Sequence, residues 1–448
     1  MKPVSKIILP PQLPTDLIGG HFRSFRKDPT GFLMRLSKLG DVGAFRMGPQ
    51  RAFFINDPEY IRDMFVVSAD KFVKGRALQR AKSLLGNGLL TNEGEFHLRQ
   101  RRMIQPAFHR SRIADYARSM VDYAERLSNE WSDGEVRDID REMMRLTLQI
   151  VAKTLFSADV TDEANEVGKA MTTLVNMFNY LLLPFSEWLE KLPLPQTRKL
   201  NHARNTLNSI IFQFIDESRR SGVDRGDLLS MLLAARDESD GSAMSDEQIR
   251  DEALTLFLAG HETTAVAMTW TWYLLSQNPE AEGKLHDELA GISGSSLSIE
   301  DIPNLRYAEA VIAESMRLFP PAWAVGRLAV ADHSFGGFAV PKGSLVLASQ
   351  WVTHRDPRFW PDAEKFKPER WFDASIKEAG QRFHYFPFGG GVRRCIGESF
   401  AWTEGILLLA TLARKWKLEL VDGQKIGLQP MITLRPKFGM KMRITSRT

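Results

Sequence analysis

Cysteine is almost absent from this chain, since Cys395 is the only one among 448 residues. A single cysteine excludes an intramolecular disulfide framework, and it also excludes every metal site that needs several cysteine ligands. We therefore expect a reducing compartment, and the cytoplasm fits this best.

Long apolar runs are missing as well. Within Met1–Asp16 the only apolar run is Ile7, Ile8 and Leu9, whereas a bilayer span needs about 20 residues. The apolar stretch Ala253–Ala259 is also too short to span. We therefore expect a soluble protein without an integral membrane anchor.

No linker divides the chain. After residue 20 there is no Gly/Ser-rich or Pro-rich stretch, no block of like charge and no repeat. A Gly-x-Gly-x-x-Gly dinucleotide fingerprint is missing too. The sequence predicts one catalytic domain over residues 1–448, with no fused reductase domain.

Arginine is the clearest charge feature of a chain whose formal net charge is +4. Basic clusters attract acidic partners or form a solvated face, and no recognised nucleic-acid motif accompanies these arginines, so we expect no nucleic-acid partner. The two clusters consist of Arg99, Arg101, Arg102, Arg110 and Arg112, and of Arg393 and Arg394.

The periodicity is mainly helical. From Asp57 to about residue 320 apolar residues recur at spacings of three and four, and prolines interrupt them. Near the start, Val42–Met47 and Arg51–Ile55 flank Gly48-Pro49-Gln50 and have the composition of a hairpin. The predicted class is mainly α with small β-sheets (α+β).

One helix is predicted to be much longer than the others. Ser245-Asp246-Glu247-Gln248 has the pattern of a capping box, and the helical periodicity continues to Asn278, before Pro279. At 1.5 Å per residue this helix is about 50 Å long. Its middle, Ala253–Ala259, is apolar on all sides, which predicts a helix through the centre of the fold.

The setting of Cys395 favours a metal ligand over the ordinary alternative, a buried and inert cysteine. Glycines at 389, 390, 391 and 397 remove side chains where a flat ligand must approach the backbone. We expect Cys395 to begin a helix, whose positive end favours the thiolate, and Arg393 adds a cation nearby. A metal held by one cysteine thiolate is typical of haem.

These residues resemble a known family pattern. Phe388, Gly391, Arg393, Cys395 and Gly397 match every fixed position of the cytochrome P450 haem-binding pattern Phe-x-x-Gly-x-Arg-x-Cys-x-Gly. The resemblance implies the cytochrome P450 fold, with the long central helix over the haem and the cysteine loop beneath it. It also implies haem b (iron protoporphyrin IX), with Cys395 as the iron ligand.

The long helix contains Ala259-Gly260-His261-Glu262-Thr263, an acid and an alcohol in an apolar setting. A zinc-protease His-Glu-x-x-His motif is excluded, because Ala265 stands where the second histidine is required. The segment resembles the P450 Ala/Gly-Gly-x-Asp/Glu-Thr motif, in which the helix bends over the haem. By this resemblance Glu262 and Thr263 are catalytic and guide protons.

Further motifs fit the same family. Glu314 and Arg317 resemble its Glu-x-x-Arg helix, and Pro368-Glu369-Arg370 resembles its Pro-Glu-Arg segment, so Glu314, Arg317 and Arg370 are expected to form a structural network. The haem carboxylates need cations. The candidates are His97, Arg101, Arg327 and Arg393, with His97 in the place of the tryptophan found in many relatives and His354 as a lesser candidate.

The resemblance implies a monooxygenase that hydroxylates or epoxidises a hydrophobic substrate such as a fatty acid, a terpenoid or another natural product. Electrons would come from a ferredoxin or flavodoxin with its reductase. The apolar segment Leu174–Trp188 is either a lid over the substrate or part of the core. Two alternatives remain: a peroxide-using haem-thiolate peroxygenase or isomerase, and a non-catalytic haem sensor.

Overall fold

The computed structural model describes residues 9–16, 19–157, 170, 173, 192, 194–373 and 375–447. The chain divides into two compact units, of which the first comprises residues 1–76, 316–366 and 370–395 and the second comprises residues 77–315, 367–369 and 396–448. Helices dominate and the sheets are small, which confirms the predicted class. The single catalytic domain over 1–448 stays a prediction.

The first unit contains a five-stranded sheet in the order β1-β2-β8-β5-β3. Strands β2 and β8 are parallel, and the other pairs are antiparallel. The predicted hairpin is present, although its second strand begins at Gln50, which pairs with Met47. The strands are β1 (Val42–Met47), β2 (Gln50–Ile55), β3 (Phe72–Lys74), β5 (Val325–Ala329) and β8 (Leu345–Ala348).

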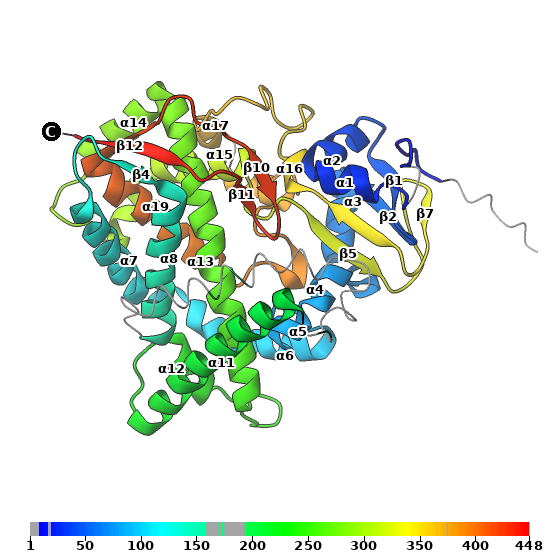
Figure 1. The fold of residues 1–448 in the computed structure, drawn as a ribbon, viewed down its shortest axis with the longest axis horizontal. Coiled ribbons are helices and arrows are strands. Elements are labelled where there is room, and N and C mark those ends of the chain that lie inside the picture. The colour runs from blue at the N-terminus through cyan, green and yellow to red at the C-terminus, as the bar shows by residue number, and fades with distance from the viewer. Residues whose placement is uncertain are drawn as a thin grey trace, which may run out of the picture. The chain divides into compact units, whose positions relative to one another are not determined.

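Short helices cover this sheet, as Figure 1 shows for α1 and α2. Phe32 of α2 packs edge-on against Phe45 of β1, with ring centroids 5.5 Å apart. The remaining elements of the unit are α1 (Phe22–Lys27), α2 (Pro29–Ser37), α3 (Pro58–Arg62), the π-helical turn η1 (Asp63–Val67), η2 (Ala69–Lys71), the hairpin β6 (His333–Phe335) and β7 (Phe338–Val340), α16 (Gln350–Thr353), α17 (Arg370–Asp373), α18 (Ile376–Gln381) and η5 (Gly391–Arg393).

The second unit is built from long helices, and Figure 1 shows α8 alongside α13. Its described helices are α4 (Arg76–Arg80), α5 (Lys82–Leu85), α6 (Gly94–Ile104), η3 (Gln105–Phe108), α7 (Arg110–Glu130), α8 (Ile139–Phe156), α11 (Pro195–Ser221), α12 (Leu228–Ala234), α13 (Asp246–Gln277), α14 (Pro279–Ala290), η4 (Ile299–Asn304), α15 (Arg306–Leu318, whose end belongs to the first unit) and α19 (Glu398–Lys415).

Helix α13 has the predicted bounds. Ser245 caps its N-terminus by accepting a hydrogen bond from the Gln248 amide, and Asn278 follows its last residue. The reciprocal half of the expected capping box is replaced by other contacts. The Gln248 side chain donates instead to the Asn87 carbonyl and to Glu252.

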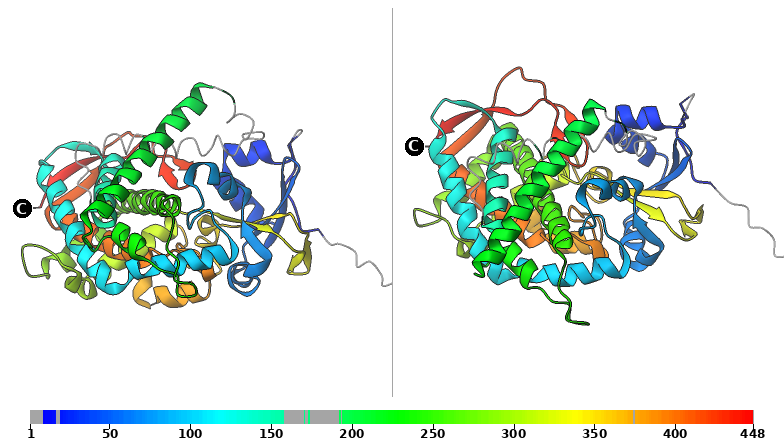
Figure 2. Two further views of the ribbon diagram at one scale, coloured as in Figure 1. Left: turned by 90° about the horizontal axis from the view of Figure 1, so that it is seen from below. Right: turned by 60° about the horizontal axis from the view of Figure 1, so that its bottom comes forward.

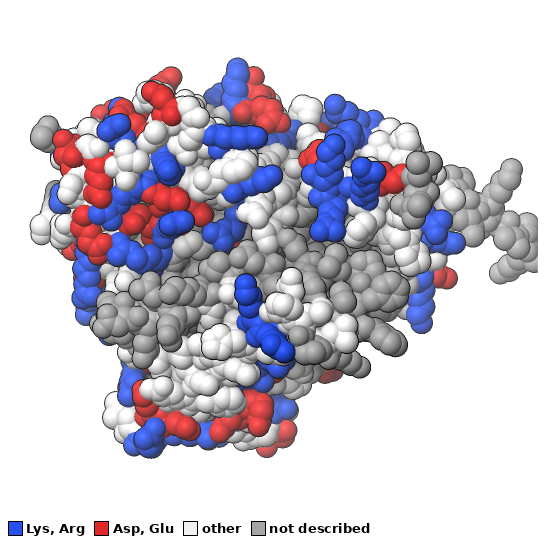
Figure 3. Space-filling model, viewed as in Figure 1, with Lys and Arg blue, Asp and Glu red and all other residues white. Residues whose placement is uncertain are grey.

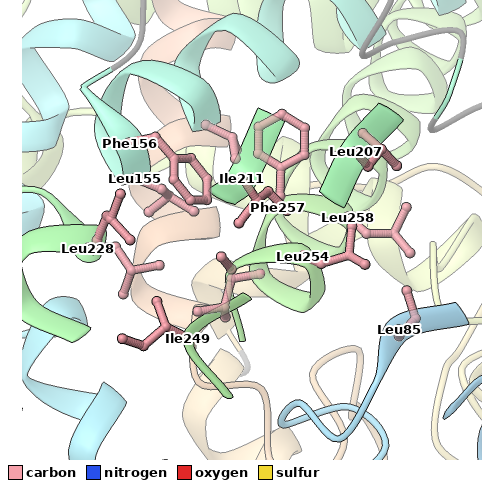
Figure 4. Close-up of a cluster of buried hydrophobic side chains, with 14 of the residues drawn as sticks. Leu85, Leu155, Phe156, Leu207, Ile211, Leu228, Ile249, Leu254, Phe257 and Leu258 are labelled. Carbon is pink, nitrogen blue, oxygen red and sulfur yellow. The ribbon is translucent and has the colours of Figure 1, made fainter. Parts of the chain in front are cut away.

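The core of the second unit surrounds α13. Figure 4 shows Leu254, Phe257 and Leu258 of α13 among side chains from α8, α11 and α12. In the views of Figure 2, α11 crosses α13 at an angle. Burying each of these large side chains stabilises the fold by about 1.5–3 kcal/mol.

Two small sheets complete the second unit. The first has the order β4-β12-β9, and the second pairs β10 with β11. The indole N–H of Trp270, on α13, donates to the Leu434 carbonyl of β11 over 2.7 Å and fixes that strand to the helix. The strands are β4 (Val136–Asp138), β9 (Trp416–Leu420), β10 (Leu428–Pro430), β11 (Leu434–Pro436) and β12 (Lys441–Ser446).

None of the helices in the described ranges combines the length and the apolar character that a bilayer crossing requires.

Candidate active site

Cys395 lies in a short loop of the first unit that its own backbone closes. The Cys395 amide donates to the Phe388 carbonyl over 3.0 Å, and the Arg394 amide donates to the Gly391 carbonyl over 3.0 Å. The Cys395 side chain is exposed, although cysteine is among the residue types most often buried. The thiol is therefore accessible to a ligand, as an iron-binding cysteine must be.

Gly391 explains why the loop requires glycine. Its φ of 65° lies in the left-handed region, and a Cβ there would overlap the carbonyl oxygen of Phe65, in η1. A side chain would separate the cysteine loop from η1. The signature glycine thus has a packing reason in this chain as well as a conformational one.

The expectation that Cys395 begins a helix is wrong by three residues. Helix α19 starts at Glu398, with Gly397 at its N-cap. Ile396 and Gly397 form a turn between the cysteine and the helix. The residue pattern does not mark this boundary, because Ile396 continues the apolar periodicity of the helix.

In the first unit, His354 is hydrogen-bonded to the segment that leads into the cysteine loop. It is fully buried, and its Nε2 accepts a hydrogen bond from the Phe386 amide over 2.9 Å. Burial and the charges of Arg317 and Arg355 hold the pKa of His354 well below its usual range, so the ring is neutral. This position fits a packing role rather than contact with a haem carboxylate.

In the second unit, α13 presents an accessible strip in the middle of its buried length. Ala259 is exposed and Thr263 is half-buried, whereas the flanking residues Leu258 and Thr264 are buried. Residues four apart lie on the same face of a helix. The Thr263 hydroxyl donates to the Ala259 carbonyl over 2.8 Å. The helix therefore presents an alcohol at an accessible strip.

The Glu262 side chain is directed toward Thr433. Its carboxyl is buried, and Oε1 accepts a hydrogen bond from the Thr433 hydroxyl over 2.6 Å. Burial raises the pKa of Glu262, while the Thr433 hydrogen bond and the Arg435 charge offset part of that rise. The acid and the alcohol predicted from sequence are adjacent in the chain, but their side chains have different partners.

The absence of a side chain at Gly260 also matters for helix packing, besides its effect on helix bending. A Cβ at this position would lie 3.1 Å from the Val151 side chain on α8, which is closer than ordinary contact. The Thr147 hydroxyl of α8 also donates to the His261 carbonyl over 2.9 Å. The small residue therefore lets α8 and α13 approach closely at the motif.

Two of the predicted haem-binding cations lie on α6 and two lie in the first unit. His97 is buried and its Nδ1 lies 2.8 Å from Oδ1 of Asn92, and Arg101 follows one turn later on the same face. Arg393 is half-buried in η5, two residues before Cys395.

Arg327 lies opposite a second cation that the sequence analysis missed. Arg327 of β5 is directly paired with Lys74 of β3, and both side chains are buried. Directly opposed residues of a sheet share a face, and like charges there repel each other. An anionic group beside the pair would offset this repulsion, and the two carboxylates of haem have that chemistry. A lysine after the apolar pair Phe72-Val73 was the available signal.

The three residues of the expected structural network are buried or half-buried. Arg317 donates to the carbonyl oxygens of His354, Ala363 and Lys365 over 2.8, 2.7 and 3.1 Å.

Arg370 donates to the Pro361 carbonyl over 3.1 Å. In the second unit, Glu314 accepts from the Lys367 amide over 3.0 Å. Each of the three binds backbone of the segment 354–367, which is consistent with a structural role.

The loop 86–92 is clamped to α13 by two acids. Asp251 accepts from the Asn87 amide over 2.6 Å, and Glu252 accepts from the Leu89 amide over 2.7 Å. Side chains at Gly86 and Gly88 would overlap Asp251 and Thr255. The clamp fixes the path of the backbone through this loop.

One arginine of the first basic cluster takes part in an ion pair. Arg99 pairs with Asp237 over 2.7 Å. On the face shown in Figure 3, basic and acidic side chains are interspersed. Leu174–Trp188, predicted as a lid or as core, lies outside the described residues.

Sequence reasoning also missed Glu404, a fully buried acid on α19. Burial raises its pKa to about 8, and the Thr264 hydroxyl offsets part of that rise. An acid within the apolar run of Ile406–Leu409 and Leu412 was a usable signal. Thr433 had none, because its partner lies 171 positions away.

The helix-dominated fold and the exposed cysteine on its glycine-rich loop agree with the family that the sequence resembles. The family model of cytochrome P450 matches residues 9–441, and the chain belongs to this family. The match covers both motifs that carry the chemistry.

Similar proteins include three from Streptomyces. Cyclooctatin synthase of Streptomyces melanosporofaciens is 39% identical, over 93% of this chain and 91% of that protein. Cyclooctat-9-en-7-ol 5-monooxygenase of the same organism is 38% identical, over 90% of this chain and 88% of that protein. Pentalenene oxygenase of Streptomyces avermitilis is 35% identical, over 96% of this chain and 95% of that protein.

The fold is also that of a solved structure. Retinoic acid bound cyanobacterial CYP120A1 superposes with a TM-score of 0.87 at 27% identity, over 98% of this chain and all of that one. The protein is thus a haem-thiolate monooxygenase that inserts one oxygen atom of O2 into a hydrophobic substrate, with electrons from a redox partner.

Proposed function

We propose that the Cys395 thiolate holds the iron of haem b and that Phe388, Gly391 and Gly397 shape the loop around it. The accessible sulfur on a closed loop supports this assignment. Haem held by a thiolate activates dioxygen for insertion of one oxygen atom into a C–H bond or an alkene.

We expect cationic side chains to bind the haem carboxylates. In the first unit Arg327 and Lys74 provide two buried charges at one register position, and Arg393 adds a third near the cysteine. From α6, His97 and Arg101 would add two donors. Arginine binds a carboxylate through two parallel hydrogen bonds, so we expect Arg327 to be the strongest single anchor.

Thr263 and Glu262 would supply the protons that cleavage of the O–O bond consumes. Thr263 presents its hydroxyl at the accessible strip of α13, which Ala259 and Gly260 also line. Glu262 is the adjacent acid, and burial raises its pKa, which favours the protonated form that a proton donor needs.

The substrate is a cyclic terpenoid, and the reaction is hydroxylation of one of its C–H bonds. The observation that carries this choice is that two of the similar proteins, cyclooctat-9-en-7-ol 5-monooxygenase and pentalenene oxygenase, are named for terpenoid substrates.

A binding titration tests this proposal. The purified ferric enzyme is titrated with a cyclic sesquiterpene, a cyclic diterpene alcohol and a long-chain fatty acid, and the haem Soret band is followed. We expect a saturable shift with a terpenoid, and a product one oxygen atom heavier on turnover. Tighter binding and hydroxylation of the fatty acid would overturn the terpenoid assignment.

The electron donor is a ferredoxin or flavodoxin with its reductase. Arg394 is exposed beside Cys395, where an acidic partner would dock, and Arg99, whose side chain is only partly exposed, serves as the comparison. Steering by exposed charges weakens as salt rises. First-electron transfer should therefore slow with ionic strength, and it should slow less steeply in Arg394→Gln than in Arg99→Gln. Identical salt slopes for both variants and the parent would contradict the charged docking.

A further inference from the structure

The hydroxyl of Thr147 connects helix α8 to the middle of helix α13. Thr147 is fully buried, and its hydroxyl oxygen lies 2.9 Å from the His261 carbonyl oxygen of α13 and 2.9 Å from the Met143 carbonyl oxygen of α8. A hydroxyl has one proton to donate and a carbonyl oxygen only accepts, so the two carbonyls share this donor. The bond to His261 links the two helices directly before Glu262 and Thr263.

The close approach of the helices that this bond needs depends on Gly260. Val151 follows Thr147 by four residues and therefore lies on the same face of α8. A Cβ at Gly260 would lie 3.1 Å from the Val151 side chain, which is closer than ordinary contact. The missing side chain thus brings the α13 backbone within reach of Thr147.

The turn of α13 that ends at His261 accepts side-chain hydrogen bonds on several carbonyl oxygens. Three of the donors belong to α13 itself, and the fourth is Thr147. Within α13 the pairs are His261 with Phe257 at 3.0 Å, Thr263 with Ala259 at 2.8 Å and Thr264 with Gly260 at 3.4 Å. Side chains that bind these carbonyls compete with the backbone amides, which weakens and bends a helix. The geometry of this turn is therefore sensitive to each donor.

Thr147 differs from the other three donors because it lies on a separate helix. The donors on α13 move with the turn that they contact, whereas Thr147 is held by the packing of α8. A donor outside the helix can keep the His261 peptide group in one orientation. Since Thr263 follows two residues later, this orientation influences where the Thr263 hydroxyl lies.

We propose that Thr147 is a positioning residue for the oxygen insertion. Its hydroxyl holds the His261 carbonyl and so fixes the turn of α13 that presents Thr263 at the accessible strip. This inference rests on the proposed role of Thr263 in guiding protons. Thr147 contacts the backbone of α13, so it acts on the reaction only through this turn.

The first arm of the test observes the His261 carbonyl without turnover. His261-Glu262 is the only histidine-glutamate pair in the sequence, so carbonyl-13C histidine and 15N glutamate label one peptide bond. Its carbonyl resonance is recorded by NMR in the reduced carbon monoxide complex of the holoenzyme, which is diamagnetic. Thr147→Val should move the resonance to lower chemical shift, because a hydrogen bond to the carbonyl is lost. Thr147→Ser should restore the parent position.

The second arm measures the fraction of electrons recovered in product, with the tightest-binding compound of the Soret titration as the probe. Thr147→Val should lower this fraction several-fold, with more hydrogen peroxide, while the dissociation constant of the probe stays at the parent value. Thr147→Ser should restore the fraction. Thr147→Ala is measured in parallel, so that poor folding of one variant leaves the other.

Thr154→Val is the matched control for both arms. Thr154 is also buried on α8, and its hydroxyl donates to the Ile150 carbonyl four residues earlier over 2.7 Å. Among the described residues it has no hydrogen bond to α13. Removal of this hydroxyl should therefore leave the His261 resonance and the product fraction unchanged.

A double variant tests whether Thr147 acts through Thr263. In the Thr263→Ala background, Thr147→Val should cause no further loss of product, because residues that act as one unit are not additive. A further loss as large as in the parent would overturn the inference, since the effect would then bypass Thr263.

The outcomes separate the two proposals. If Thr263→Ala keeps the parent product fraction, the proposed role of Thr263 fails, and its positioning by Thr147 fails with it. If Thr263→Ala loses product but Thr147→Val keeps the parent fraction, only the inference about Thr147 is overturned. An unchanged His261 resonance in Thr147→Val would also overturn it.

Discussion

The hydroxyl of Thr263 lies 2.8 Å from the carbonyl oxygen of Ala259, and the two residues mark the accessible strip of an otherwise buried stretch of helix α13. The hydrogen bond keeps the alcohol at the helix surface, and within the described ranges the structure shows no partner for it on another element. Removal of the hydroxyl should therefore affect chemistry more than folding.

Thr263→Ala should lower product formed per electron consumed, with hydrogen peroxide as the main additional product, because the alcohol that guides protons is gone. Thr263→Ser keeps the hydroxyl and should retain most coupling. Thr269→Ala is the matched control, since that threonine makes the same bond to the residue four positions earlier but is fully buried. Full coupling in Thr263→Ala would remove the proposed role.

Cys395→Ser should abolish the thiolate-type Soret band of the reduced carbon monoxide complex, because serine provides no thiolate to the iron. The measurement is a reduced difference spectrum of the purified variant, with haem content determined in parallel. A spectrum identical to that of the parent would contradict the assignment of Cys395.

Arg327→Leu and Lys74→Met should each weaken haem retention. A charged hydrogen bond contributes about 1.5–3 kcal/mol, which corresponds to roughly a 10- to 150-fold faster loss of haem if all of it is lost in dissociation. The assay is capture of released haem by an excess of apomyoglobin. Lys365→Met, at an exposed lysine, is the control and should keep the parent rate. Equal rates in all four proteins would refute the anchoring role.

Glu404 should make stability depend on pH. Its folded pKa of about 8 lies above the ordinary value of 4.5, so unfolding releases a proton between these limits. The contribution of Glu404 to stability is therefore fully present below about pH 4.5 and falls by up to about 1.4 kcal/mol per pH unit until the pH passes the folded pKa.

Glu404→Gln should flatten that decline. Denaturant midpoints of the holoenzyme from pH 5 to 8 measure it, and Glu419→Gln, at an exposed position of β9, serves as the control. The same slope in Glu404→Gln as in the parent would show that Glu404 ionises normally.

Features that depend on neighbouring residues, such as helix ends and short loops, could be predicted from the sequence. The Ser245 cap and Pro279 were sufficient to place both ends of α13, and the spacing around Cys395 was sufficient to identify the family. The start of α19 was missed because Ile396 and Gly397 form a turn, and no Ser, Thr, Asp or Asn stands at the N-cap to mark where the helix begins.

Partners distant in sequence were beyond such reasoning. Glu262 is recognisable as an acid in an apolar helix, but its hydrogen bond to Thr433 depends on how β11 packs against α13. Likewise, Lys74 can be recognised as a candidate haem-binding cation only from the strand register that places it opposite Arg327. Long-range strand register is set by the whole fold rather than by neighbouring residues.

The clamp between α13 and the loop 86–92 has a consequence for protein engineering. Asp251 and Glu252 grip the backbone amides of Asn87 and Leu89, so the side chains of the loop can be exchanged while its path is kept. Libraries that vary this loop should therefore keep Asp251 and Glu252. Gly86 and Gly88 should be left unchanged in such libraries, because any larger residue would push the loop off its helix.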